Sequence, residues 1–278
     1  MIEIKNMSFG YTKSRQIFKD LNLTLASGHI YGLLGKNGAG KTTLLKQITG
    51  LLFPKEGTVT VDGTDAAARS AETLGDIYFL QEEMYTPHLR ITDFEKAYAP
   101  FYEHFDHDKF SEYLQEFEVE DGRAYIDRLS HGQKKKVLIA FAIASNTKIL
   151  IMDEPTNGLD IPSKSVFRKL MAAGIDDSRL VIISTHQVRD LHSLIDTATI
   201  LEKGKIILNA SAAEITDRLL FDADNTKSDS DEILYEEETP RGTYQVKKNS
   251  KHLDSNLDLE LLFNAAISNR EEFYNIFK

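Results

Sequence analysis

The chain has 278 residues, a formal net charge of -10, and a composition of 41% hydrophobic and 27% charged residues, which is typical of a globular protein. Because it contains no cysteine, disulfide scaffolds, thiolate metal sites and cysteine nucleophiles are excluded. Its acidic balance makes binding to nucleic acid or to an anionic bilayer through bulk charge unfavourable. The length allows one large domain or two small ones.

Neither a membrane span nor a secretory signal is expected. The longest apolar run, near Val137–Ala144, is far shorter than the roughly 18–20 residues that cross a bilayer. The N-terminal residues MIEIKNMSFGY do not place a long apolar run after a charged segment. We therefore expect a cytoplasmic protein.

Short apolar runs alternate with longer helical patterns, which predicts an α/β fold with a mainly parallel sheet. In the first third of the chain we expect a helix at Lys41–Leu51 and strands at Ile2–Phe9, Phe18–Leu25, Ile30–Leu34, Gly57–Asp62 and Asp76–Leu80. The continuous apolar runs Ile149–Met152 and Leu180–Ser184 are typical of strands buried on both faces. A closing hairpin is predicted from Thr199–Leu201, Lys203-Gly204 and Lys205–Leu208.

Between about residues 85 and 145 the periodicity is helical and no strand is indicated, so we expect a helical insertion in the α/β core. This segment is rich in aromatic residues: Phe94, Tyr98, Phe101, Tyr102, Phe105, Phe110, Tyr113 and Phe117. Two interpretations stay open. The aromatic residues form the small core of the insertion, or some of them line a groove for a helix of a partner.

After residue 220 the composition changes. Asp222–Glu238 contains eight acidic residues and one basic residue, a net charge of -7 over seventeen positions, which is typical of a solvated linker. Beyond it, Thr243–Val246 predicts a strand and the apolar spacing from Leu257 to Phe277 predicts a terminal amphipathic helix. The role of this part is left open among a disordered tail, an appendage that stabilises a dimer and a regulatory contact.

The strongest chemical signal is a glycine-rich segment between a predicted strand and a predicted helix, the context that a phosphate-binding loop requires. Its residues are Gly35, Lys36, Asn37, Gly38, Ala39, Gly40, Lys41, Thr42 and Thr43. The glycines let backbone N–H groups turn toward phosphate, and the helix N-terminus adds its positive dipole end. Lys41 would contact the β- and γ-phosphates of a nucleotide, and the Thr42 hydroxyl would bind Mg²⁺.

A second signal is the run ILIMDE at residues 149–154. A buried strand that ends in two carboxylates places both at the carboxyl edge of a parallel sheet, beside the phosphate loop. Asp153 fits a magnesium ligand, and Glu154 fits a base that polarises an attacking water.

The third signal is LSHGQ at residues 129–133, followed by three lysines and an apolar helical run. Ser130 predicts a helix N-cap. Lysines at 134–136 in the first helical turn oppose the helix dipole. They are explained if an anion docks there, and a solvated basic turn is the alternative.

In this combination the chain resembles the nucleotide-binding subunits of ATP-binding cassette (ABC) transporters, with GKNGAGKTT as Walker A loop, ILIMDE as Walker B strand and LSHGQ as signature. The resemblance covers about residues 1–210 and implies a P-loop NTPase core with an antiparallel β subdomain and a helical signature insertion. Residues 211–278 are then a small C-terminal extension with the acidic linker and the terminal helix. Single-cassette chains with such an extension are similar to subunits of bacterial ABC-2 export systems.

The resemblance also implies roles for further residues. Tyr11 matches the aromatic residue that stacks on adenine, and Gln81 matches a glutamine that reaches Mg²⁺ and the attacking water. His186 matches the switch histidine at the γ-phosphate, and Asp160 matches the D-loop. The signature residues Ser130, His131, Gly132 and Gln133 would contact the ATP of a second subunit. His131 departs from the family pattern, which most often has glycine there.

The activity implied is hydrolysis of ATP with Mg²⁺ by two chains that close around two ATP molecules. The second chain is another copy or a paralogous ATPase subunit. An integral membrane permease would be a separate partner, no nucleic acid is expected, and the chain would lie on the inner face of the cell membrane. The alternatives are a soluble ABC ATPase acting on a ribosome or DNA complex, and an inactive or regulatory cassette.

Overall fold

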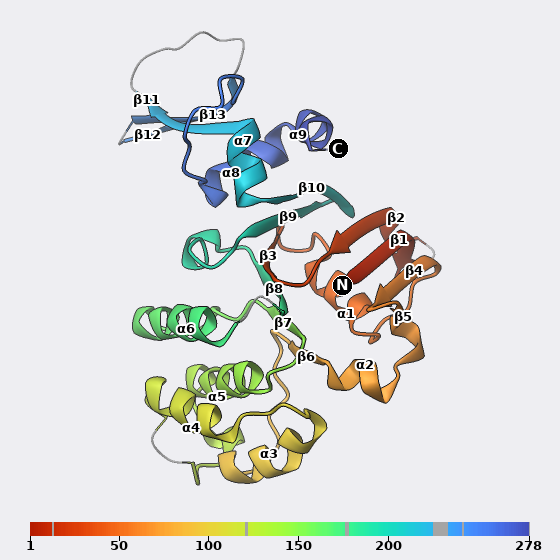
Figure 1. Cartoon of the computed structure of the whole chain (residues 1–278), viewed down its shortest axis with the longest axis vertical. Coiled ribbons are helices and arrows are strands. Elements are labelled where there is room, and N and C mark those ends of the chain that lie inside the picture. Colours follow the sequence, from red (N-terminus) through yellow and green to blue (C-terminus); the bar gives the residue numbers. More distant parts are fainter. Residues whose placement is uncertain (13, 120–121, 176–177, 225–232, 241, 278) are drawn as a thin grey trace.

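The computed structural model describes residues 1–12, 14–119, 122–175, 178–224, 233–240 and 242–277. A six-stranded sheet lies at the centre, in the order β10-β9-β3-β8-β7-β6 (Figure 1). Its strands are β3 (His29–Leu34), β6 (Ile77–Leu80), β7 (Ile149–Asp153), β8 (Leu180–Thr185), β9 (Thr197–Glu202) and β10 (Lys205–Ser211). All neighbours are parallel except β10, which returns antiparallel along β9 in the predicted hairpin.

A second sheet is antiparallel and lies beside the first, with the order β2-β1-β4-β5 (Figure 1). It consists of β1 (Ile2–Gly10), β2 (Gln16–Leu25), β4 (Glu56–Val61) and the short β5 (Thr64–Asp65). The expected strands and the expected antiparallel subdomain are therefore present, each strand within three residues of the bounds that the sequence pattern indicates.

The helices in the first 210 residues are α1 (Lys41–Ile48), α2 (Ala71–Gly75), α3 (Ile91–Tyr98), α4 (His107–Glu116), α5 (His131–Ala144) and α6 (Ile161–Gly174). The helices α3, α4 and α5 form the expected insertion, and Figure 1 places them together at the end of the molecule opposite the C-terminal elements. Helix α5 begins in a capping box, in which Ser130 accepts from the Gln133 N–H and Gln133 accepts from the Ser130 N–H.

The aromatic residues of the insertion mainly form its core. Phe94, Phe110, Tyr113 and Phe117 are buried, whereas Phe101 is 71% exposed. Phe141 of α5 lies among the rings of Tyr78, Phe94, Tyr102, Phe105 and Phe110. The core interpretation is therefore confirmed for most of these side chains.

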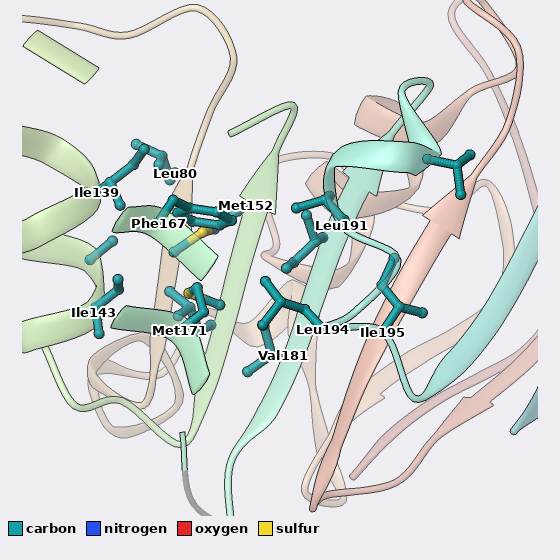
Figure 2. Close-up of a cluster of buried hydrophobic side chains, with 14 of the residues drawn as sticks. Leu80, Ile139, Ile143, Met152, Phe167, Met171, Val181, Leu191, Leu194 and Ile195 are labelled. Carbon is teal, nitrogen blue, oxygen red and sulfur yellow. The ribbon is translucent and has the colours of Figure 1, made fainter. Parts of the chain in front are cut away.

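The central sheet separates two hydrophobic cores, because successive side chains of a strand point to opposite faces. On β7, Ile149 and Ile151 join the core with α1 and the antiparallel sheet, whereas Leu150 and Met152 join the core with α5 and α6. Figure 2 shows the second core, with Met152 of β7 close to Phe167 and Met171 of α6. Strands buried on both faces fix the carboxyl edge of the sheet firmly in place.

The C-terminal elements pack on the edge of the central sheet (Figure 1). They are α7 (Ala212–Arg218), β11 (Leu219–Asp224), β12 (Ile233–Thr239), β13 (Gly242–Lys248), α8 (Leu259–Ser268) and α9 (Arg270–Ile276). The three strands form an antiparallel sheet in the order β11-β13-β12. Leu259, Leu262 and Phe273 are fully buried and belong to the same core as α5 and α6.

Two expectations for this region need correction. Asp222–Asp224 and Ile233–Glu238 are strand residues rather than a linker, and 225–232 lie outside the described residues. The acidic side chains are compatible with a sheet because β13 supplies counterparts: Lys247 binds Asp222 at 3.1 Å. The single terminal helix is two helices, α8 and α9, which meet at Asn269, whose side chain binds the Leu234 carbonyl.

Candidate functional site

The glycine-rich loop joins β3 to α1 and borders a cavity of about 550 Å³. Gly38 and Gly40 have φ angles of 80° and 108°, a region that favours glycine. At Gly35 a Cβ atom would lie 2.6 Å from the Leu201 carbonyl oxygen, so no side chain fits. The loop therefore passes close to its neighbours and ends at a helix N-terminus, where an anion is favourable.

Lys41 and Glu154 form a buried ion pair at this cavity. Their side chains are 7% and 5% exposed, and the Lys41 ammonium lies 3.4 Å from Glu154 Oε1. Lys41 also donates to the Gly35 carbonyl at 2.9 Å, which holds its stem along the loop. A buried cation needs such partners, because burial without them is costly.

Asp153 lies at the end of β7 and is fixed from two neighbouring elements. The Thr42 hydroxyl donates to Asp153 Oδ2 at 2.6 Å, and the Ser184 hydroxyl of β8 donates to Oδ1. Asp153 is 1% exposed and stands opposite Ser184 in the parallel register. A carboxylate and a hydroxyl oxygen thus meet at the carboxyl edge of the sheet.

Glu154 is the residue of the site with the most unusual backbone. Its φ of 48° lies in the left-handed region, which costs an ordinary residue about 1–2 kcal/mol. Its N–H donates to Ser184, and His186 Nδ1 lies 2.9 Å from Oε1. Oε2 is buried and has no hydrogen-bond partner, so an acceptor oxygen is available inside the protein.

Most of the residues that the sequence predicts to bind ATP or Mg²⁺ line this cavity. Those that line it are Tyr11, Lys36, Asn37, Gly38, Gly40, Lys41, Thr42, Thr43, Asp153, Glu154 and His186. Gly35 and Ala39 belong to the same loop without lining the cavity. Tyr11 is 53% exposed and its hydroxyl lies 3.1 Å from Thr43 Oγ1, so its ring stands at the mouth of the cavity.

Gln81 is the expected residue that the structure does not bring to the cavity. Its side chain is exposed, and the next residue, Glu82, lines the cavity instead. Glu82 accepts from the Asn157 amide at 3.1 Å. Both residues follow the end of β6 at Leu80, and of the two only Glu82 lines the cavity.

The signature residues Ser130, His131, Gly132 and Gln133 do not line this cavity either. They form the start of α5, where Ser130 and Gln133 are occupied by the capping box and remain exposed. His131 lines a neighbouring hollow of about 530 Å³, together with Lys135 and Gly158, and this hollow shares Glu82 and Asn157 with the cavity. Within one chain the four signature residues therefore do not line the cavity beside the glycine-rich loop.

Asp160 is the N-cap of α6. It accepts from the Ser163 N–H at 2.8 Å, and its hydrogen bonds with Ser163 hold the pKa of the Asp160 carboxyl below its usual range. The expected D-loop residue therefore fixes the start of a helix, and it does not line the cavity.

Sequence reasoning missed several residues near the site. Arg15, Ile17, Glu82 and Asn157 line the cavity, and Ser184 holds Asp153. The signal for Ser184 was available, since two adjacent parallel strands that both end in polar residues bring those residues together. The other four lie on irregular segments or at the edge of the antiparallel sheet, where the sequence indicates no partner.

Lys135 departs from the expectation of a lysine that faces a docked anion. It is 1% exposed, and its ammonium donates to the carbonyls of Glu154 and Asn157 at 2.6 and 2.8 Å. Burial lowers the pKa of Lys135, and the carboxylates of Glu82, Glu154 and Asp153 act in the opposite direction. The Lys135 side chain thus points into the protein and bonds to main-chain carbonyls.

The residues at the cavity fit a magnesium nucleotide. The loop offers N–H groups and Lys41 for phosphate, and Thr42 and Asp153 offer the oxygen ligands that Mg²⁺ prefers. Among the described residues no group of three or more His, Cys, Asp or Glu could hold a metal ion by itself. Mg²⁺ usually takes one or two carboxylates from the protein and completes its shell with phosphate and water.

The comparisons with known proteins point the same way. The family model described as "ABC transporter" matches residues 18–157. The chain is 30% identical to the ABC transporter ATP-binding protein NatA of Bacillus subtilis (strain 168) over 74% of this chain and 88% of NatA. It is 32% identical to the lipopolysaccharide export system ATP-binding protein LptB of Escherichia coli (strain K12), over 76% of this chain and 90% of LptB.

A solved structure has the same fold. The dimeric post-hydrolysis state of the ATP-binding cassette MJ0796, bound to ADP and Pi, superposes with a TM-score of 0.66 and 23% identity, over 76% of this chain and 98% of that one. The matched family model, the relatives and the geometry of the cavity agree. The chain belongs to the ABC transporter family, as one of its ATP-binding, ATP-hydrolysing cassettes.

Proposed function

We propose that the chain powers export of a substrate through a separate membrane-spanning partner, and that it works as a dimer closed around two ATP molecules. The dimer is formed with a second copy or with a paralogous ATPase subunit. Residues 1–210 would be the nucleotide-binding domain, with the helical insertion at about 85–145, and residues 211–278 the C-terminal extension. The roles of single residues in ATP hydrolysis are part of this proposal.

The observation that carries the dimer is the separation of the two ATP-binding surfaces within one chain. The cavity is lined by the glycine-rich loop, Asp153, Glu154 and His186, whereas none of the residues Ser130–Gln133 lines it and His131 lines the neighbouring hollow. If the signature is to contact the γ-phosphate, it must come from a second chain. A symmetric pair satisfies this need twice, because each chain has one loop and one signature. The cassette MJ0796, which has this fold, forms a dimer.

The hydrolysis site would use the groups that already meet at the cavity. Lys41 would move its ammonium from Glu154 to the phosphates, and His186 would contact the γ-phosphate. The buried oxygen Oε2 of Glu154 would accept a proton from the attacking water as the bond to ADP breaks. Mg²⁺ held by Thr42 and Asp153 would neutralise charge on the phosphates. Gln81 would have to turn toward the cavity to reach Mg²⁺ and the attacking water, since its side chain does not line the cavity here.

Among the described residues no helix is long and apolar enough to span a membrane. Two observations support a membrane partner. The family is that of transporter ATP-binding subunits, and LptB is named as part of an export system. Phe101 and Tyr85 of the insertion are 71% and 81% exposed, and we propose that they contact a helix of the partner. The chain would then lie on the inner face of the membrane through this partner.

The first prediction concerns the phosphate loop. Lys41→Ala is expected to weaken ATP binding at least tenfold, because the cavity loses its buried cation. Lys46→Ala removes a lysine from the same helix away from the cavity and is expected to bind ATP like the wild type. Titration of both variants with a fluorescent ATP analogue measures this. Unchanged affinity of Lys41→Ala would remove Lys41 from the phosphate site.

The second prediction concerns the dimer. Glu154→Gln is expected to bind ATP, to hydrolyse it at least a hundredfold more slowly, and to accumulate as an ATP-dependent dimer. Light scattering after size-exclusion chromatography, with and without MgATP, measures the mass, and Glu72→Gln on the exposed surface is the control. A variant that stays monomeric with ATP bound would contradict the dimer, and near-normal turnover would contradict the role of Glu154.

The third prediction concerns the partner. The chain, purified by affinity from detergent-solubilised cells of its source, is expected to bring down a polytopic membrane protein in stoichiometric amount, identified by mass spectrometry. Ribosomal or DNA-associated partners without a membrane protein would favour the soluble ABC ATPase instead. Reconstituted with that membrane protein, the complex is expected to move its substrate away from the side that holds the ATPase, and the reverse direction would overturn export.

A further inference from the structure

Lys135 lies on the signature helix but bonds to the segment that carries Glu154. Its ammonium is buried and donates to the main-chain oxygens of Glu154 and Asn157, at 2.6 and 2.8 Å. A fully buried ammonium is unfavourable unless it is paired, and main-chain carbonyls supply this pairing. The Lys135 side chain therefore connects helix α5 to the turn after Glu154. Among the described residues, no backbone hydrogen bond joins these two elements.

The segment that Lys135 holds is a turn with a residue in the left-handed region at each end, of which only the one at Glu154 is strained. Glu154 has a φ of 48° and Gly158 a φ of 78°. The Glu154 carbonyl also accepts from the Asn157 N–H at 3.3 Å, so the turn and the lysine share one acceptor. A residue in the left-handed region keeps that conformation only when its surroundings determine it. The two bonds from Lys135 are such a constraint at both ends of the turn.

His131 contacts the same segment from one helical turn earlier. Residues four apart lie on one face of a helix, so His131 and Lys135 face the turn together. A Cβ atom built at Gly158 would lie 3.0 Å from His131 Cδ2 and 3.3 Å from Nε2. The His131 ring thus occupies the space beside Gly158, and the signature helix meets the turn at two points.

We propose that Lys135 is a positioning residue for hydrolysis, which fixes the main chain at Glu154 and Asn157 to the signature helix of the same chain. Lys135 touches neither the nucleotide cavity nor its loop. Without its two bonds the turn is free to relax, and the Glu154 carboxylate loses its fixed direction toward the cavity. Movement of helix α5 would by the same connection move Glu154. The inference rests on the proposed role of Glu154 in hydrolysis.

The test uses Lys135→Met in the full chain, because methionine retains much of the apolar stem and removes both donors. The expected result is a kcat for ATP hydrolysis at least tenfold lower, with a Kd for ATP within threefold of the wild-type value. Lys135→Arg, whose guanidinium can donate to two carbonyls, is expected to recover at least a third of the lost kcat. Lys169→Met, on the exposed face of α6, is the matched control and is expected to keep the wild-type kcat.

Wild-type kcat in Lys135→Met would overturn the proposal. So would a parallel loss of ATP binding, since that pattern indicates a general loss of structure rather than a misplaced Glu154. Failure of Lys135→Arg to exceed Lys135→Met would also contradict it. The Glu154→Gln dimer is measured separately. If that variant hydrolyses ATP normally, the proposed role of Glu154 fails, whereas a normal Lys135→Met beside an inactive Glu154→Gln refutes only the role of Lys135.

Discussion

The buried pair of Lys41 and Glu154 is the interaction on which the rest of the site depends. The Lys41 and Glu154 side chains are only 7% and 5% exposed, so each charge needs partners inside the protein. They pair with each other, and in addition Lys41 donates to the Gly35 carbonyl while Glu154 contacts His186. The same pair faces a cavity of about 550 Å³ and contains an acceptor oxygen without a partner. Lys41 has protein partners when no nucleotide is bound, and its ammonium can exchange Glu154 for phosphate.

The fold serves to place these charges at one edge of the sheet. Lys41 follows β3, Asp153 ends β7, and Ser184 lies near the end of β8, so three adjacent parallel strands supply the site. Each of these strands is buried between two cores, which leaves little freedom for its end to move. Two parts contact this rigid edge from outside: the turn after Glu154 and the helix that carries Lys135. A partner chain that moves either part would change the position of Glu154.

Residue types and spacing predicted the features that short stretches of sequence determine. The structure contains three of them: the glycine-rich loop, the strands buried on both faces and the N-cap at Ser130. The burial of the Lys135 ammonium and the position of Glu82 at the cavity depend on tertiary packing, which spacing does not encode. The strands around the acidic segment were missed because their stability comes from pairing with β13 and not from composition.

The most direct test is the structure of the wild-type chain bound to a non-hydrolysable ATP analogue and Mg²⁺. We expect the Lys41 ammonium to leave Glu154 for the β- and γ-phosphates, the Thr42 hydroxyl to leave Asp153 for the metal ion, and a second chain to cover the γ-phosphate with Ser130–Gln133. A nucleotide bound elsewhere, or one bound in this cavity while Lys41 remains on Glu154, would contradict the account.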